Sequence, residues 1–258
     1  MSTFKHPFAK EDFEDNSGEL LVRLKSPKDC ICDGLQWIGG DFDQRHPDFG
    51  RVVPCACLAA EQNNSLREFL WNGSGITQSL DNPTFESFSS ELYEGGEYAK
   101  RSVINWVRQE GTVPWLIITG PPGLGKTHLC KAATGNLVGM NQSVFYTTVR
   151  GIMNKSREWI SNKQGDKWSS YLNKIEHIKY LVLDDLGQEY TTDWSKQILF
   201  DIIDTRYETR LPTLVTTNID QKDWARQLGK ACTDRLTDYV LSKHVVLQGS
   251  SVRQKASR

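Results

Sequence analysis

The chain has 258 residues, a formal net charge of −1 and six cysteines. This length allows one ordinary domain with a smaller unit attached, which is the arrangement we expect. The balanced charge excludes an overall basic field, so contact with nucleic acid would need a local patch. The sequence has no signal peptide, transit peptide or run of about 18 apolar residues, so we expect a cytoplasmic protein without membrane contact.

The N-terminal part begins with residues 1–29, which are polar and acidic and show no helical or strand period. We expect them to be disordered, or to become ordered on a partner. Residues 61–83 are rich in Asn, Ser, Gly and Gln, which is typical of a connector, although Trp71 and Ile76 indicate that parts of it dock. We place the domain boundary near residue 75, between an N-terminal partner-binding segment (1–75) and a larger domain (76–258).

Between these stretches, residues 30–57 are interrupted by Gly, Pro and Asp and cannot build a core of their own. They contain two close cysteine pairs, namely Cys30 with Cys32 and Cys55 with Cys57. In a reducing compartment, four thiolates match a structural zinc site in number and softness. The one-residue spacing strains ligation by both thiols of a pair, so His46 as a substitute ligand and free cysteines stay open as alternatives.

In the larger domain, strand and helix patterns alternate, which predicts an α/β fold with a parallel sheet covered by helices on both faces. The expected strands are Trp115–Thr119, Val144–Thr148, Tyr180–Asp184, Thr213–Thr217 and His244–Leu247. The expected helices are Lys126–Leu137, Val149–Ile160 and Asp193–Thr209.

A glycine-rich loop follows the first of these strands and has the spacing of a Walker A motif, from Gly120 to Gly125, Lys126 and Thr127. Glycines allow backbone N–H groups to converge on phosphate oxygens, and Lys126 adds a positive charge where the helix begins. Thr127 can ligate magnesium. We therefore predict an ATP-binding P-loop that comprises Gly120, Pro121, Pro122, Gly123, Leu124, Gly125, Lys126, Thr127 and His128.

Polar residues follow the later strands. Asp184 is expected to hold magnesium, directly or through water, while Asp185 points the other way off the strand and polarises the attacking water. Asn218 can contact water near the γ-phosphate, with a turn or helix cap as the alternative. Two later residues, Arg235 and Arg253, are candidates for stabilising charge on the transferred phosphoryl group, although sequence alone does not aim either one.

The segments GPPGLGKT, YLVLDDLGQE, LFDIIDTRYETRLPTLVTTN and LGKACTDRL follow one another in this order. Over about residues 80–253 this succession resembles the bacterial DnaC/DnaI helicase loaders, a branch of the AAA+ ATPases. The stretch HPDFGRVVPCAC also resembles the zinc-bearing N-terminal domain of DnaI-type loaders and their phage relatives.

This resemblance implies an AAA+ P-loop ATPase core with a small zinc-binding N-terminal domain. It implies that Lys126 and Thr127 bind the phosphates and magnesium. It further implies that Asp184 is the Walker B acid, Asp185 the water-activating acid and Asn218 the sensor-1 residue.

The same resemblance makes Arg235 the arginine finger for a neighbouring subunit's ATP and Arg253 the sensor-2 arginine of its own subunit. The sequence departs from the family pattern at two places. Asp29 stands where the outer cysteine of the first pair is expected, which leaves the zinc ligands open. Lys230 replaces an additional arginine of many relatives, which removes one candidate phosphate contact.

Cations and aromatic rings are mixed in the stretch 150–174, where loaders carry a distinguishing helical insertion. They are Arg150, Lys155, Arg157, Lys163, Lys167 and Lys174 with Trp159, Trp168 and Tyr171. Phosphates bind cations and unpaired bases stack on rings, so this stretch is a candidate surface for single-stranded DNA. The alternative is an amphipathic helix pair with its aromatic residues in the core.

The function implied by the resemblance is an ATP-hydrolysing loader that places the replicative hexameric helicase on single-stranded DNA during replication initiation. Its implied partners are the helicase, single-stranded DNA and further copies of itself in a spiral or ring. Two alternatives remain open. One is an IstB-type transposition helper ATPase. The other is a nucleotide-gated DNA-binding adaptor with negligible hydrolysis, because Asp185 reaches less far than the more usual Glu.

Overall fold

The computed structural model describes residues 37–39, 52–54, 68, 70–76, 82–111, 113–187 and 192–249. Contacts divide the chain into two units, Met1–Glu68 and Phe69–Arg258. This division falls earlier than the expected boundary near residue 75, because the residues from Leu70 onward pack into the second unit, where the Leu70 side chain is buried in the core.

The first unit contains an antiparallel pair of strands, β1 (Trp37–Gly39) and β2 (Val52–Pro54), with Trp37 opposite Pro54. The predicted zinc ligands Cys30, Cys32, Cys55 and Cys57 lie outside the described residues, as does His46. The zinc site therefore stays a prediction.

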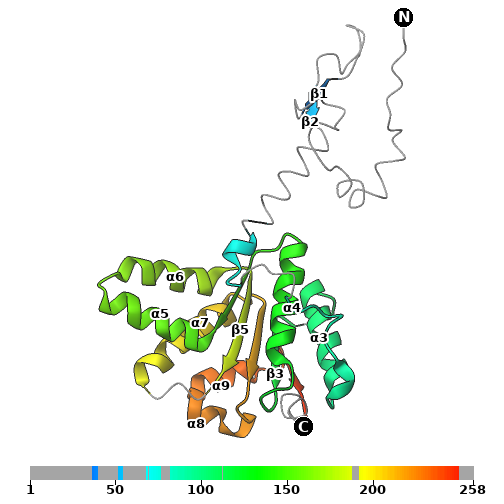
Figure 1. The fold of residues 1–258 in the computed structure, drawn as a ribbon. Coiled ribbons are helices and arrows are strands. Elements are labelled where there is room, and N and C mark those ends of the chain that lie inside the picture. Colours follow the sequence, from blue (N-terminus) through cyan, green and yellow to red (C-terminus); the bar gives the residue numbers. More distant parts are fainter. Residues whose placement is uncertain are drawn as a thin grey trace, which may run out of the picture. The chain divides into compact units, whose positions relative to one another are not determined.

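The second unit contains a five-stranded sheet in which every neighbouring pair is parallel, in the order β4-β5-β6-β3-β7 (Figure 1). The strands are β3 (Trp115–Thr119), β4 (Val144–Thr148), β5 (Tyr180–Leu186), β6 (Thr213–Thr217) and β7 (Ser242–Val246). Three of them have the predicted bounds, β5 continues beyond Asp184 to Leu186, and β7 begins at Ser242 rather than His244. Because β6 lies between β3 and β5, side chains at its end can meet both the glycine-rich loop and the two acids.

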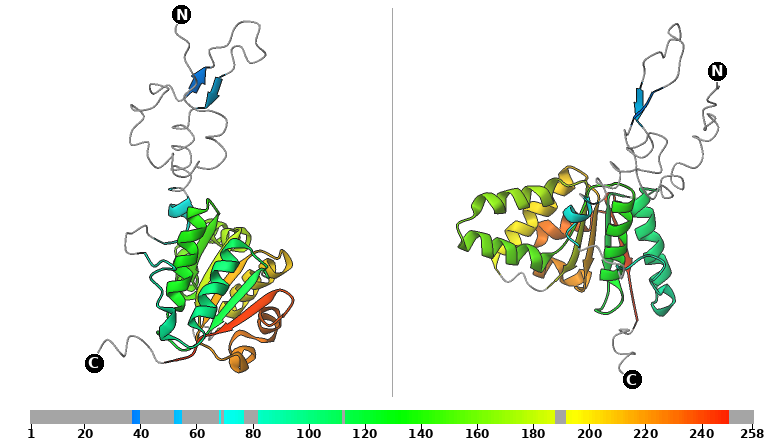
Figure 2. Two further views of the ribbon diagram at one scale, coloured as in Figure 1. Left: turned by 90° about the vertical axis from the view of Figure 1, so that its right-hand side faces the viewer. Right: turned by 45° about the horizontal axis from the view of Figure 1, so that its top comes forward.

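Helices cover both faces of this sheet, as predicted (Figure 2). They are α3 (Gly96–Arg108), α4 (Lys126–Gly139), α5 (Val149–Ser161), α6 (Gly165–His177), α7 (Asp193–Glu208), α8 (Trp224–Leu228) and α9 (Lys230–Leu236). Successive strand residues point to opposite faces. In β3, Leu116 and Ile118 pack with α3 and α4, whereas Trp115 and Ile117 pack with the later helices. No helix in the described parts is both long enough and apolar enough to cross a membrane.

A buried arginine joins three elements of this fold. Arg206, on α7, has no exposed surface. Its guanidinium donates to the carbonyl oxygens of Ile175, Ile178 and Pro212, and its Nε donates to Thr213 Oγ1 at 2.9 Å. Burial lowers the pKa of Arg206 to about 9. Carbonyl dipoles thus solvate this cation, which ties the C-terminal end of α6 to the start of β6.

Candidate nucleotide-binding site

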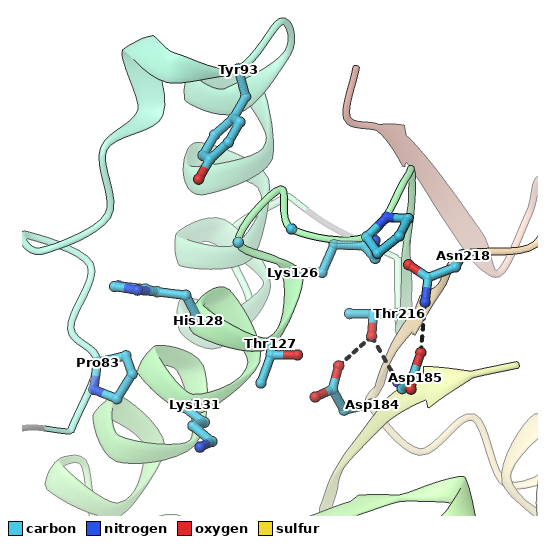
Figure 3. A pocket seen from close by; sticks show the side chains of 13 residues that line it. Pro83, Tyr93, Lys126, Thr127, His128, Lys131, Asp184, Asp185, Thr216 and Asn218 are labelled. Atoms are coloured by element: carbon cyan, nitrogen blue, oxygen red, sulfur yellow. Dashed lines mark hydrogen bonds between the residues drawn. The ribbon is translucent and has the colours of Figure 1, made fainter. Parts of the chain in front are cut away.

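A cavity of about 600 Å³ opens where β5 and β6 end and α4 begins (Figure 3). It is lined by Pro83, Tyr93, Pro122, Gly123, Gly125, Lys126, Thr127, His128, Lys131, Asp184, Asp185, Thr216 and Asn218. The fold therefore brings together the predicted loop lysine, the predicted magnesium ligands and the predicted water-contacting residues. Their individual roles stay predictions.

The loop before α4 has a backbone that only glycine adopts without strain. Gly120, Gly123 and Gly125 all have positive φ angles. A Cβ atom at Gly120 would lie 2.4 Å from the Leu247 carbonyl oxygen, and one at Gly125 would lie 2.6 Å from the Phe88 ring. No side chain caps the N-terminus of α4. An open cradle of glycines at an uncapped helix N-terminus fits a phosphate chain.

The Lys126 side chain folds back along this loop and is only 7% exposed. Its Nζ donates to the carbonyl oxygens of Gly120 at 2.5 Å and Pro121 at 2.7 Å. Burial lowers the pKa of Lys126 to about 8, and the charges of Asp184 and Asp185 oppose that shift. The ammonium is thus held next to the cradle and facing the two acids.

The Asp184 carboxylate is fixed at both oxygens and is only 2% exposed. Thr216 Oγ1 donates to its Oδ1 at 2.5 Å, and Tyr146 Oη donates to its Oδ2 at 2.9 Å. Burial, reinforced by the Asp184 charge, raises the pKa of Tyr146 well above its usual value, so the phenol keeps the proton that it donates. The sequence interpretation included neither Thr216 nor Tyr146.

The chain bends at Asp185, which has φ +57°. Between Leu183 and Leu186 the pairing with β6 shifts register, which marks a β-bulge. Asp185 N donates to Thr216 Oγ1 at 3.0 Å, and Asn218 Nδ2 donates to Asp185 Oδ1 at 2.7 Å. The expectation that Asp185 points away from Asp184 is therefore wrong, because the bulge interrupts the alternation and both carboxylates line the same cavity.

The oxygen ligands offered here suit magnesium. Thr127 offers a hydroxyl, and Asp184 and Asp185 offer carboxylates, all hard oxygen ligands. Among the described residues no group of three or more His, Cys, Asp or Glu could enclose a metal ion. Magnesium is usually held by one or two carboxylates together with water and substrate phosphates.

At the other end of the cavity His128 was predicted, whereas Tyr93, Lys131 and Pro83, which lies in the stretch interpreted as a connector, were not. Pro83, Tyr93 and Lys131 line it together with His128. The His128 Nε2 atom lies 2.8 Å from the Thr84 carbonyl oxygen, and the ring lies 5.5 Å from that of Phe88. These partly apolar and ring-bearing walls suit a flat base beyond the phosphate cradle.

Of the two arginines predicted to contact phosphate, the structure describes Arg235 but not Arg253. Arg235, on α9, forms an ion pair with Asp204 and lies with its guanidinium carbon 4.9 Å from the Phe200 ring centroid. It is not among the residues that line the cavity of its own chain. Arg253 lies outside the described residues.

The stretch 150–174 forms the helical hairpin of α5 and α6. The Tyr171 ring is buried, with the rings of Trp159 and Phe145 at 5.3 and 5.8 Å between centroids. Lys155 Nζ lies 4.5 Å from the Tyr171 ring centroid. The alternative of a helix pair with packed aromatic residues is confirmed for Tyr171, which cannot stack on a base. All six cations of the stretch are exposed.

The parallel sheet, the glycine loop, the two adjacent acids and Asn218, which directly follows β6, together define the P-loop core of an AAA+ ATP-binding protein. Residues 97–258, more than half of the chain, match the family described as IstB-like ATP binding protein. The chain belongs to this family.

Particular proteins resemble the chain over most of its length. The replicative helicase loader DnaC of Escherichia coli (strain K12) is 29% identical over 222 residues, which cover 86% of this chain and 89% of DnaC. A crystal structure of DnaI has a TM-score of 0.53 at 22% identity, covering 74% of this chain and 98% of that one. The replication initiator DnaA bound to AMPPCP and single-stranded DNA has a TM-score of 0.55 at 18% identity, covering 69% of this chain and 55% of that one. At these identities the two structures show a shared fold.

Proposed function

We propose that this protein is an ATP-dependent loader that binds the replicative hexameric helicase and single-stranded DNA and places the helicase on DNA during replication initiation. The similarity to the helicase loader DnaC over 86% of the chain carries the proposal. The cavity supports its ATP-dependent part, because Asp184, Asp185 and Asn218 face a glycine cradle with a buried lysine.

The proposed chemistry is hydrolysis of ATP. The loop amides and Lys126 would bind the β- and γ-phosphates, and Thr127 and Asp184 would hold magnesium. Bound magnesium supplies charge neutralisation at these phosphates. Asp185, oriented by its hydrogen bond from Asn218, accepts a proton from the water that attacks the γ-phosphorus, while the bond to the bridging oxygen breaks and ADP leaves.

The proposed assembly is a homo-oligomer, as a spiral or ring, in which Arg235 completes the cavity of a neighbouring subunit. Two observations support this role. Arg235 does not line its own cavity, and its side chain keeps 25% of its surface exposed. To reach another subunit's phosphates, the guanidinium has to exchange Asp204 for the developing charge of the transferred phosphoryl group.

The proposed DNA surface is the exposed cationic side of the α5–α6 hairpin. Reversing Arg157 and Lys163 to Glu tests it without disturbing Lys155, which packs over Tyr171. We expect weaker binding of single-stranded DNA and a smaller dependence of its affinity on salt. The matched control reverses Arg101 and Arg108 on α3, which are also exposed. Equal loss in both variants, or in neither, contradicts the assignment.

A transposition helper ATPase is the nearest alternative, because the family description names IstB. Co-purification with the host replicative helicase in the presence of ATP separates the two functions. A loader retains the helicase when ATP is present, and a Lys126→Ala variant retains less of it. A chain that retains no helicase under these conditions is not a loader.

A further inference from the structure

The segment Leu70–Ile76, which follows the N-terminal unit, lies against the outer edge of the sheet (cyan in Figure 1). Strand β4 is the last strand on that side. The Tyr146 N–H donates to the Ser74 carbonyl oxygen at 2.6 Å, and the Ser74 side chain has no exposed surface. Gly75 has φ +85°, and a Cβ atom there would lie 2.1 Å from the Tyr146 carbonyl oxygen. A glycine at this position is therefore required for the segment to sit on β4.

A second contact holds the same segment from α6. Lys174 Nζ donates to the Gly73 carbonyl oxygen at 2.8 Å and lies 4.3 Å from the Phe145 ring centroid. Phe145 precedes Tyr146 on β4. The segment is thus bound by the edge strand and by the hairpin to which we assign DNA binding.

Tyr146 also contacts the nucleotide site. Tyr146 is bound by Ser74 at its backbone and donates from its hydroxyl to Asp184 Oδ2. Asp184 Oδ1 is occupied by Thr216, so Tyr146 is the group that fixes the second oxygen of the proposed magnesium ligand. Tyr146 therefore connects the segment Leu70–Ile76 with Asp184, the proposed magnesium ligand.

We infer that Tyr146 is a positioning residue for Asp184, and that seating of Leu70–Ile76 on β4 is coupled through Tyr146 to the binding of magnesium and nucleotide. The inference rests on the proposed ATP site. Coupling is reciprocal, so magnesium–ATP stabilises the seated segment and loss of seating weakens magnesium-dependent binding. A partner that pulls on the N-terminal unit would in this way loosen the hold on ATP.

Two glycines in the segment give a matched pair of variants. Gly75→Ala forces a Cβ atom onto Tyr146 and unseats the segment. Gly73→Ala is the control, because a Cβ atom there meets no atom within 4 Å and the residue does not have a positive φ. Tyr146→Phe removes only the hydroxyl and keeps the backbone contact with Ser74.

Hydrogen exchange of the Tyr146 amide reports seating without reference to hydrolysis. In the parent chain, we expect magnesium–ATP to slow this exchange. Gly75→Ala exchanges faster without nucleotide and binds magnesium–ATP about tenfold more weakly, the effect of losing a hydrogen bond to a charged group. Its affinity for ATP in EDTA is unchanged, and Gly73→Ala behaves as the parent.

Tyr146→Phe separates the backbone contact with Ser74 from the hydroxyl contact with Asp184. Its amide exchanges as slowly as in the parent without nucleotide, but magnesium–ATP no longer slows the exchange further. The affinity of this variant for magnesium–ATP falls as in Gly75→Ala, and the double variant shows no additional loss because both changes break one connection.

The inference is overturned if the parent binds magnesium–ATP with no change in exchange at Tyr146. It is also overturned if Tyr146→Phe binds magnesium–ATP like the parent, a result that stays informative even where Gly75→Ala lowers stability. A parent chain that binds no ATP at all contradicts the proposed function, and the inference with it.

Discussion

The position of Asp184 on β5 is fixed from the two strands that neighbour β5. Its two carboxylate oxygens accept hydrogen bonds from different strands, Thr216 on β6 and Tyr146 on β4. The Thr216 hydroxyl also accepts from the Asp185 amide, so one side chain holds both acids. Two donors hold this buried carboxylate in place, as a ligand for magnesium needs to be held.

A variant at Asp185 distinguishes the proposed enzyme from a nucleotide-gated adaptor. We predict that Asp185→Asn keeps its affinity for magnesium–ATP and lowers the rate of hydrolysis about 100-fold, because the group that accepts the proton is removed. Steady-state ATPase rates with and without single-stranded DNA measure this. Equal and negligible rates in parent and variant would favour the adaptor.

Among single residues, the sequence predicts those whose spacing defines a motif. The loop from Gly120 to Thr127 and the acids at Asp184 and Asp185 belong to this class. All of them line the cavity except Gly120, Pro121 and Leu124. Thr216 and Tyr146 are different, because their roles depend on which strands are neighbours. The order β4-β5-β6 is a property of the folded sheet and has no local signature in the sequence.

At the scale of elements, three of the five strands of the parallel sheet were predicted to the residue, as for Val144–Thr148. Helices α5 and α7 begin at the predicted residues and end within one residue of the predicted ends, and in each a Thr side chain, Thr148 or Thr192, accepts from a first-turn amide. Helix α3 was not predicted. The buried positions of α3 nevertheless have helical spacing, which was a usable signal.

Arg206, on α7, connects this helix with the end of α6 and with β6 through its hydrogen bonds. We predict that Arg206→Met lowers the free energy of unfolding by about 3 kcal/mol, because several buried carbonyl groups lose their donor at once. Urea unfolding followed by circular dichroism measures this. The control is Arg210→Met, at an exposed position after the same helix, which is expected to change stability by less than about 0.5 kcal/mol. A similar loss in both variants would mean that Arg206 has no special structural role.

At the scale of the whole molecule, the N-terminal unit is predicted to bind zinc. Strand β1 follows Cys32, and β2 ends directly before Cys55, so the described strand pair lies between the two cysteine pairs in sequence. We predict about one zinc ion per purified chain and its loss in Cys55→Ser. Elemental analysis measures this, with Cys232→Ser, a buried cysteine of the second unit, as the control. A parent without zinc contradicts the prediction.

Oligomerisation is testable by mixing two inactive variants. Arg235→Ala keeps an intact cavity, and Asp185→Asn keeps an intact Arg235. If Arg235 acts on the neighbouring subunit, each variant alone hydrolyses ATP slowly, and a mixture regains part of the parent activity because some interfaces combine both intact parts. Hydrolysis that stays at the level of the separate variants would contradict action between subunits.

The most direct test of the loader proposal is deposition of the host replicative helicase on closed circular single-stranded DNA, measured by recovery of DNA-bound helicase after removal of free protein. With ATP, the parent chain is predicted to increase the bound helicase well above the level reached by the helicase alone, and Lys126→Ala is predicted not to. The loader proposal would be contradicted if the same amount of DNA-bound helicase were recovered with the parent chain, with Lys126→Ala and with the helicase alone.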